Sequence, residues 1–285
     1  HPAPGMCRLQ VLTSSPLLGN VTFDGPRRGG GPGYALLELG PYADGVGEAL
    51  YRLYTPGSMW SGAIIGGTGI GKSRVMENIV ISALSGGDTE VWFADAAGGA
   101  SSTGLAEHAD WFVNTANAGH MLDAALAILD GRGEEWLSEG WTDFTPTPER
   151  PGLLIVVDEC HEVFKTRPAE LSRIPSEGRK FGLALLVLDQ DPSVKTFGGD
   201  GALRSSIMEG NAVGMRSTSN ETSQMMAGLD VDLKKLPQIP GYAVLQGNTD
   251  AGIRTAPFRN RDTAKTAGKW LAAQPRPGLD TLAAT

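Results

Sequence analysis

The sequence predicts an α/β fold, in which helices flank a mostly parallel central sheet and a small β element lies at the N-terminus. A glycine-rich loop at 66–73 stands between a strand-like apolar run and a helical pattern. Apolar runs at 153–157 and 183–188 have the length and composition of strands that are buried on both faces. Such strands, separated by helical segments, are typical of α/β proteins with a parallel sheet.

The remaining elements follow from local patterns. The run YALLEL at 34–39, among many glycines and prolines, indicates the small β element. EVWFAD at 90–95 indicates a strand that ends in Asp95, for which we favour a structural role. Residues 121–141 have the periodicity of a core-packing helix. We therefore divide the chain into a Gly/Pro-rich β element at 1–50, a large α/β domain at 51–262 and a C-terminal tail at 263–285.

Composition limits the classes of function. The chain has 285 residues, of which 41% are hydrophobic and 20% charged, as in ordinary globular proteins. The net charge of -8 argues against a generally basic nucleic-acid-binding protein, although positive charge can be confined to a few loops. No apolar run approaches the roughly 18 residues that cross a bilayer. Cys7 and Cys160 lie far apart and are expected to be free thiols.

The loop at 66–73 reads GGTGIGKS and matches the phosphate-binding pattern GxxxxGK[ST] at every specified position. Glycines let backbone N–H groups turn inward around phosphate oxygens, where a side chain would collide. The following helix adds unpaired donors and the positive end of its dipole. We expect this loop to bind a nucleoside triphosphate through Gly67, Thr68, Gly69, Ile70, Gly71, Lys72 and Ser73.

Two acidic residues follow the strand at 153–157. Because ligands bind at the carboxyl ends of parallel strands, Asp158 is placed to hold Mg²⁺ together with Ser73. Glu159 is placed to act as the general base towards the attacking water. Lys72 is expected to reach the β- and γ-phosphates and to take part in catalysis.

The letters DECH at 158–161 are also used by nucleic-acid helicases. Such enzymes need a second domain with its own arginine motif, and residues 159–285 contain no QxxGRxxR-like segment. We therefore interpret Cys160 and His161 as the start of the next loop or helix. Gln190, near the tip of the strand at 183–188, is a candidate for contact with the γ-phosphate or its water. The alternative, a polar residue that merely opens a loop, fits its position equally well.

The order of these motifs, followed by GRxxG…QxPSV at 178–194 and an arginine-bearing strand, resembles the motor domain of the FtsK/SpoIIIE–HerA class of DNA-pumping ATPases. The resemblance runs from about residue 34 to 262 and implies a RecA-like P-loop core that binds ATP and Mg²⁺. Several segments look closer still to the transfer proteins of actinomycete conjugative plasmids. They are HADWF (108–112), DECHEVF (158–164), GNAV (210–213), IPGYA (239–243) and TAPFRNR (255–261).

The resemblance implies a homo-hexameric ring that translocates double-stranded DNA during conjugation. It makes Arg216 the first choice for an arginine that acts on the neighbouring subunit's nucleotide, with Arg204 and Arg179 as alternatives. Lys195 could face a central channel, although an exposed loop lysine is the simpler interpretation. The expected location is cytoplasmic, with any membrane attachment made by segments outside this chain.

One departure from the family pattern keeps other functions open. The usual Thr-Gln-Arg-Pro is here DQDP at 189–192, and an acidic residue near the γ-phosphate could weaken hydrolysis. A nucleotide-binding assembly module that hydrolyses little is therefore one alternative. A type VII secretion-like ATPase that acts on protein substrates is another, because it keeps the motor and changes the cargo.

Overall fold

A computed structural model of the chain describes residues 13, 15, 17–165, 167–220, 222, 226, 231–246, 248, 249, 252, 253 and 256–277. Cys7 lies outside this range. Cys160 is a free, buried thiol, as expected.

The central sheet consists of β5 (Gly62–Ile65), β6 (Thr89–Asp95), β7 (Trp111–Asn114), β8 (Gly152–Asp158), β9 (Leu183–Asp189), β10 (Asn211–Met215), β11 (Tyr242–Gln246) and β14 (Pro257–Arg259). These eight strands lie in the order β14-β11-β10-β5-β9-β8-β6-β7. Strands β5 to β10 run parallel, whereas β11 and β14 form an antiparallel edge. The prediction of a mostly parallel sheet is confirmed.

The strand order brings the predicted site to one edge of the sheet. β9 lies between β5, which leads into the phosphate loop, and β8, which ends in the acidic pair. In register, Ile65 pairs with Asp189, and Asp158 pairs with Leu188. The carboxyl ends of all three strands therefore lie side by side at the topological switch point of the sheet. This is where open α/β sheets bind ligands.

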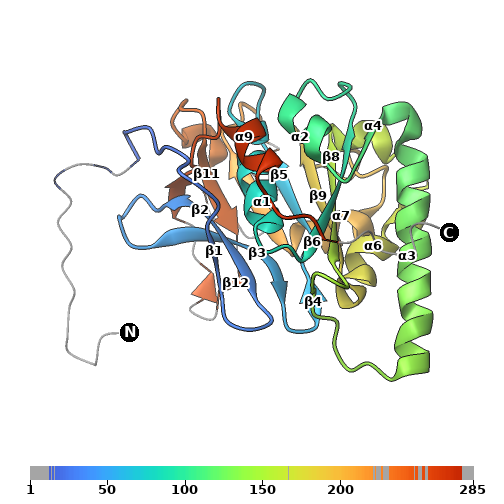
Figure 1. Cartoon of the computed structure of the whole chain (residues 1–285). Helices are drawn as coiled ribbons and strands as arrows, with labels where there is room; N and C mark the ends of the chain where they lie inside the picture. The colour runs from blue at the N-terminus through green and yellow to red at the C-terminus, as the bar shows by residue number, and fades with distance from the viewer. Residues whose placement is uncertain are drawn as a thin grey trace, which may run out of the picture.

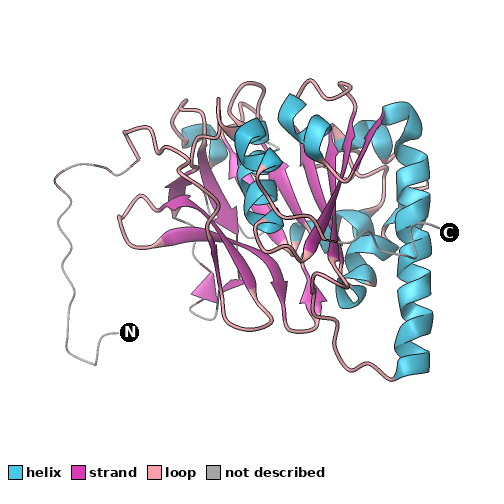
Figure 2. Ribbon diagram, in the orientation of Figure 1, coloured by secondary structure: helices cyan, strands magenta, loops and turns pink. Residues whose placement is uncertain are grey.

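Helices cover both faces of this sheet (Figure 2). One face carries α1 (Lys72–Leu84), α2 (Thr103–His108) and α9 (Ala267–Ala272). The other carries α3 (Ala118–Glu139), α4 (Cys160–Val163), α5 (Pro168–Leu171), α6 (Arg173–Ser176) and α7 (Gly201–Met208). Short 3-10 helices η1 (Thr115–Asn117), η2 (Gly178–Phe181) and η3 (Leu233–Lys235) join these elements. Successive residues of β8, such as Leu153 and Leu154, are buried in opposite core clusters, which explains its unbroken apolar sequence.

A small antiparallel sheet lies at the N-terminal side. Its strands are β1 (Arg28–Gly29), β2 (Ala35–Pro41), β3 (Glu48–Thr55) and β4 (Ser58–Met59). A hairpin of β12 (Asn248–Thr249) and β13 (Gly252–Ile253) completes the described strands. The predicted N-terminal β element is thus confirmed, and its sheet continues past residue 50. The three-part division of the chain stays a prediction.

Helix α1 lies between the two sheets (Figure 1). All residues from Val75 to Leu84 are buried, because the central sheet covers one side while β2 and α9 pack on the other. The polar Asn78 on this enclosed helix donates to the Leu39 carbonyl (3.0 Å) and to Asn260 Oδ1 (2.9 Å). Among the described helices, none combines the length and apolar character needed to cross a membrane.

Segments from the two ends of the sequence meet beside this small sheet. The Asp262 N–H donates to the Val21 carbonyl (2.7 Å), and the Arg261 N–H donates to the Leu39 carbonyl (2.9 Å). The buried Arg261 guanidinium binds both oxygens of Glu48, at 2.8 and 3.0 Å. Such a two-point pair fixes direction as well as distance, so it locks the C-terminal segment onto the small sheet.

Candidate nucleotide-binding and hydrolysis site

The phosphate loop joins β5 to α1, as its sequence predicts. Gly69 (φ 74°) and Gly71 (φ 99°) have left-handed backbone conformations that favour glycine. The Gly66 N–H donates to the Asp189 carbonyl (3.3 Å), and the Gly67 N–H donates to the Arg216 carbonyl (3.0 Å). The base of the loop is therefore tied to the ends of β9 and β10.

Lys72 is folded back into the loop. Its Nζ donates to the carbonyls of Gly66 (2.9 Å) and Gly67 (3.3 Å). Burial lowers the pKa of Lys72, while the negative charges of Asp158, Glu159 and Asp189 oppose this shift. The ammonium thus faces both the loop and the acidic residues, a position suited to phosphate oxygens entering between them.

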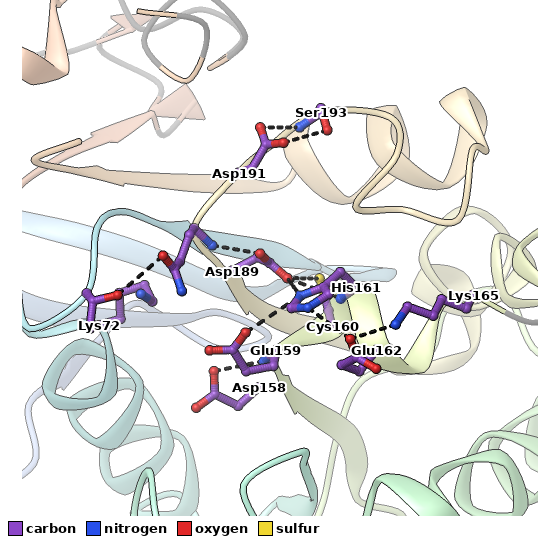
Figure 3. A network of polar contacts seen from close by, with 12 residues as sticks. Lys72, Asp158, Glu159, Cys160, His161, Glu162, Lys165, Asp189, Asp191 and Ser193 are labelled. Carbon is purple, nitrogen blue, oxygen red and sulfur yellow. Dashed lines mark hydrogen bonds and ion pairs between the residues drawn. The ribbon is translucent and has the colours of Figure 1, made fainter. Parts of the chain in front are cut away.

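Asp158 and Glu159 lie side by side at the tip of β8 (Figure 3). Asp158 is 6% exposed, and burial, together with the charges of Asp95 and Glu159, raises its pKa. Glu159 has φ 52° and ψ 52°, a left-handed conformation that costs a non-glycine residue on the order of 1–3 kcal/mol. Such local strain is typical of functional positions.

These acidic residues fit the predicted metal. A buried carboxyl whose pKa is raised by its acidic neighbours is relieved when a divalent cation binds it. Asp158, from β8, and Ser73, from the first turn of α1, offer the oxygen ligands that Mg²⁺ prefers. The buried Asp95 instead accepts from Ala97 N (2.8 Å), Gly99 N (2.9 Å) and Ser101 Oγ (2.9 Å), so it shapes its own loop.

Gln190 reaches the phosphate loop. Its Oε1 accepts a hydrogen bond from Thr68 Oγ1 at 3.3 Å, and its N–H donates to Asp189 Oδ1 at 2.7 Å. The bond to Thr68 therefore places Gln190 at the same end of the sheet as Lys72, Asp158 and Glu159, the three residues that Figure 3 labels there. An open cavity of about 740 Å³ lies beside Gln190.

The acidic residues on either side of Gln190 are both engaged by neighbours. Asp189 Oδ2 lies 2.7 Å from His161 Nδ1 and accepts from the His161 N–H at 3.1 Å. Asp191 turns away and accepts from Ser193 N (3.0 Å) and Oγ (2.7 Å) (Figure 3). The contact of His161 with Asp189 could not be predicted from local patterns, because only the pairing of β8 with β9 brings the two residues together.

The contacts of His161 lead to a pH prediction. Partial burial lowers its pKa, but the bond to Asp189 and the charges of Asp189, Glu159 and Glu162 outweigh this and raise the pKa overall. Because the pKa of His161 is raised in the folded state, the protonated side chain stabilises the fold. This stabilisation is complete at pH values below the unfolded pKa of about 6.5, and it is lost as the pH rises through the folded pKa. We expect His161→Gln to lower the Tm most at about pH 5.5 and least at about pH 9. A Tm difference that does not change with pH would contradict this assignment.

The candidate arginines have different surroundings. Arg216 follows β10 and donates through Nη1 to the carbonyls of Lys234 (2.9 Å) and Leu236 (2.6 Å). Arg204 Nε donates to the Pro192 carbonyl (2.5 Å). Arg179 lies over the Trp60 ring, 5.3 Å from its centroid, in η2 at the opposite end of β9 from Gln190. A role for Arg216 on a neighbouring subunit stays a prediction, and in this chain its Nη1 is already engaged by these two carbonyls.

Lys195 is exposed and lines the cavity beside Gln190 together with Lys165. Its loop is fixed by the buried Phe197, which packs 6.3 Å from Phe164 between ring centroids. The side chain is thus free to meet a ligand, and its contact with DNA stays a prediction.

No protein-family profile and no curated protein sequence matches this chain. Solved structures do. The conjugation coupling protein TcpA of pCW3, in a monomer form with ATPγS, has a TM-score of 0.67 and 18% identity over 89% of this chain and 73% of that one. The cytoplasmic domain of the Thermomonospora curvata type VII secretion ATPase EccC has a TM-score of 0.59 and 24% identity over 80% of this chain and 28% of that one.

ATPases 2 and 3 of EssC from Geobacillus thermodenitrificans have a TM-score of 0.66 and 12% identity over 93% of this chain and 54% of that one. This chain thus spans about half or less of the EccC and EssC chains. At these identities the similarity establishes the fold. The chain has the RecA-like P-loop fold that these ATPase structures share.

Proposed function

We propose that this chain hydrolyses ATP. The observation that carries the proposal is the meeting of Lys72, Asp158, Glu159 and Gln190 at the carboxyl ends of β5, β8 and β9. The loop at 66–73 would hold the triphosphate, and Ser73 and Asp158 would hold Mg²⁺, which would supply positive charge at the phosphates. Glu159 accepts the proton of the attacking water, and Gln190 orients that water or the γ-phosphate.

The acidic DQDP segment is compatible with hydrolysis. Asp189 is bound by His161 and by the Gln190 backbone N–H, and Asp191 is bound by Ser193, so both carboxylates are already engaged by protein groups. This arrangement favours an active ATPase over a module that binds nucleotide and hydrolyses little.

Hydrolysis is proposed to drive the translocation of double-stranded DNA by a homo-hexameric ring in conjugative transfer. The proposal is supported by the motifs shared with FtsK-class motors and by the fold shared with a conjugation coupling protein. In such a ring Arg216 would act on the nucleotide of the adjacent subunit, and the motor would work in the cytoplasm. Contacts with DNA would be directed at phosphates, because a translocating motor must pass any sequence.

A type VII secretion-like role is the second candidate. Its support is the fold shared with EccC and EssC, one structure of which is a complex of EccC with a signal sequence peptide. In that role the cargo would be protein, and the hydrolysis site would be the same.

The test is steady-state ATP hydrolysis with and without long duplex DNA. A DNA motor is expected to hydrolyse ATP faster with DNA, and Lys195→Ala is expected to reduce this stimulation and its salt dependence. Stimulation that is equal in Lys195→Ala at several salt concentrations would remove Lys195 from the DNA path. An assembled ring whose rate of ATP hydrolysis is the same with and without DNA would instead favour the protein-secretion role.

A further inference from the structure

A second cavity opens at the end of the central sheet opposite to the phosphate loop. Its volume is about 370 Å³, within the range of about 300–1,000 Å³ that accommodates small ligands. Ser61, Lys180 and Gly210, which precede β5, β9 and β10, form part of its lining. Because these strands are parallel, their amino ends lie together, at the end of the sheet where Figure 1 labels β4. The cavity is therefore separate from the nucleotide-binding and hydrolysis site.

Three positive side chains gather at this cavity. Arg179 and Lys180 line it, and the Arg179 guanidinium lies 5.3 Å from the centroid of the Trp60 ring, which also lines it. Arg52, from β3, stacks on the same ring at 3.6 Å. Burial lowers the pKa of Arg52, and the nearby charge of Arg179 adds to this shift. The two guanidinium groups therefore repel each other, and an anion bound beside them would relieve this repulsion.

The protein supplies little negative charge to balance these cations. In the part of the chain that the structure describes, none of the three forms an ion pair. Glu209 is the acidic residue among the described lining, and it is exposed to solvent. The Glu177 carboxylate, which directly precedes η2, is bound by Arg173 at 3.1 Å. The positive charge at the cavity is thus left for a ligand to balance.

The cations stand on a fixed frame. Trp60 Nε1 donates to Thr55 Oγ1 (2.9 Å), which holds the ring on which Arg52 stacks. The Arg52 backbone N–H donates to Asn211 Oδ1 (3.0 Å), and Asn211 Nδ2 donates back to the Arg52 carbonyl (2.9 Å). Arg52 Nη2 also donates to the Gly210 carbonyl at 3.2 Å. Arg52 therefore cannot turn away from Arg179 without breaking these contacts.

The donors of the lining favour a phosphate group over a carboxylate. Ser176 of α6 and Ser206 of α7 add hydroxyl groups to the guanidinium of Arg179 and the ammonium of Lys180. A guanidinium fork matches two phosphate oxygens, and an ammonium binds a third as a point charge. A phosphate ester carries a charge of about −2 and three acceptor oxygens at neutral pH, whereas a carboxylate carries one charge on two oxygens.

We propose that this cavity is a second anion site, which binds a phosphate group apart from the nucleotide that the loop at 66–73 would hold. Arg179 and Lys180 bind the phosphate oxygens, Ser206 donates its hydroxyl, and Arg52 adds positive charge beside them. The same chemistry recognises the phosphate of a free small molecule and that of a nucleic-acid strand, and the test separates these two sources. The site does not depend on ATP hydrolysis.

The test is calorimetric titration with inorganic pyrophosphate, at low salt and without Mg²⁺. The titrations use the full chain with Lys72→Ala, so that the phosphate loop contributes little to the binding. Adding Arg179→Gln and Lys180→Gln to this chain is expected to weaken pyrophosphate at least about 10-fold, because two charge-assisted contacts are lost. Ser206→Asp keeps both cations and brings a negative charge to the cavity, and it is expected to weaken binding to a similar extent.

Arg150→Gln with Lys269→Gln is the matched control, because it removes the same charge elsewhere. Arg150 also stacks on a tryptophan, 3.2 Å from the centroid of Trp141, but it is paired with Glu135 at 2.9 Å. The control is expected to bind pyrophosphate within about twofold of its parent, since exposed charges contribute little. Without ligand, Arg179→Gln is expected to melt no lower than the wild type, because it relieves the repulsion with Arg52.

Competition with a short single-stranded oligonucleotide identifies the source of the phosphate. Displacement of pyrophosphate would assign the site to a nucleic-acid strand, and no displacement would assign it to a free small molecule. Equal affinity with and without Arg179 and Lys180 would overturn the site. Pyrophosphate binding that is present in the wild type and lost with Lys72→Ala alone would belong to the phosphate loop and also overturn it. So would a control that loses as much affinity as the cavity variant, or a chain that binds no pyrophosphate.

Discussion

Glu159→Gln is expected to slow ATP hydrolysis by about 10²- to 10⁴-fold while leaving ATP binding intact, because the amide cannot accept the proton of the attacking water. The substitution keeps the size of the side chain at the strained tip of β8. It also removes one of the charges that raise the pKa of Asp158, so the affinity for nucleotide should not fall. The measurement is steady-state hydrolysis together with the Kd for Mg²⁺–ATP.

Glu162→Gln provides the matched control. Glu162 lies three residues further on in α4, and its carboxylate binds Lys165 (2.6 Å) and His161 Nε2 (3.2 Å). Its loss should leave the hydrolysis rate within about threefold, because surface ion pairs contribute little. If both variants lose activity equally, Glu159 acts through the local structure and not as the base. If Glu159→Gln stays as fast as the wild type, another group activates the water.

Lys72→Ala is expected to abolish hydrolysis and to lower the affinity for ATP by about 10- to 100-fold, because it removes a charge-assisted contact with the β- and γ-phosphates. Its ammonium now donates to the carbonyls of Gly66 and Gly67, so those bonds are lost as well. Thermal unfolding with and without ATP distinguishes a loss of ATP binding from a loss of the folded structure. The variant should unfold cooperatively, while ATP should raise its Tm far less than that of the wild type.

Lys269→Ala, on α9, is the control for Lys72→Ala. Lys269 lies over the Trp270 ring, 5.8 Å from its centroid, and lies outside the phosphate loop. Lys269→Ala is expected to bind ATP with the affinity of the wild type. An ATP-induced rise in Tm as large for Lys72→Ala as for the wild type would contradict the role of Lys72.

The part of the site that the sequence predicts is the part that local patterns encode. The glycine–lysine–serine loop and the strand that ends in two acids can each be recognised from a few consecutive residues. The parallel order of the strands then predicts that their carboxyl ends lie close together. A role for Gln190 is harder to predict, because a polar residue after a strand indicates a site only if that strand lies beside the phosphate loop. The strand order places β9 between β5 and β8. The hydrogen bond with Thr68 brings Gln190 to the phosphate loop, and its contact with the γ-phosphate or its water stays a prediction.

Contacts across long sequence separations could not be predicted. His161 meets Asp189 only through strand pairing, and Arg259 faces Gly71 only because β11 and β14 add an antiparallel edge. The segments IPGYA and TAPFRNR contain Gly241 and Arg259 and resemble a family, but nothing in their spacing predicts that these two residues line one cavity. The extent of the small sheet was equally hidden, since β3 continues through Thr55 into what looked like the α/β domain.

The meeting of residues 21–39 with residues 261 and 262 affects how the chain is made. Folding that depends on contacts distant in sequence is slow, and a ribosome adds roughly 5–20 residues per second. Val21 and Leu39 therefore wait roughly 10 to 50 seconds for their backbone partners to be synthesised. During that interval α1 also lacks the covering provided by α9. A nascent chain would expose this apolar helix until α9 has been synthesised, and exposed apolar surface of this kind is prone to aggregation.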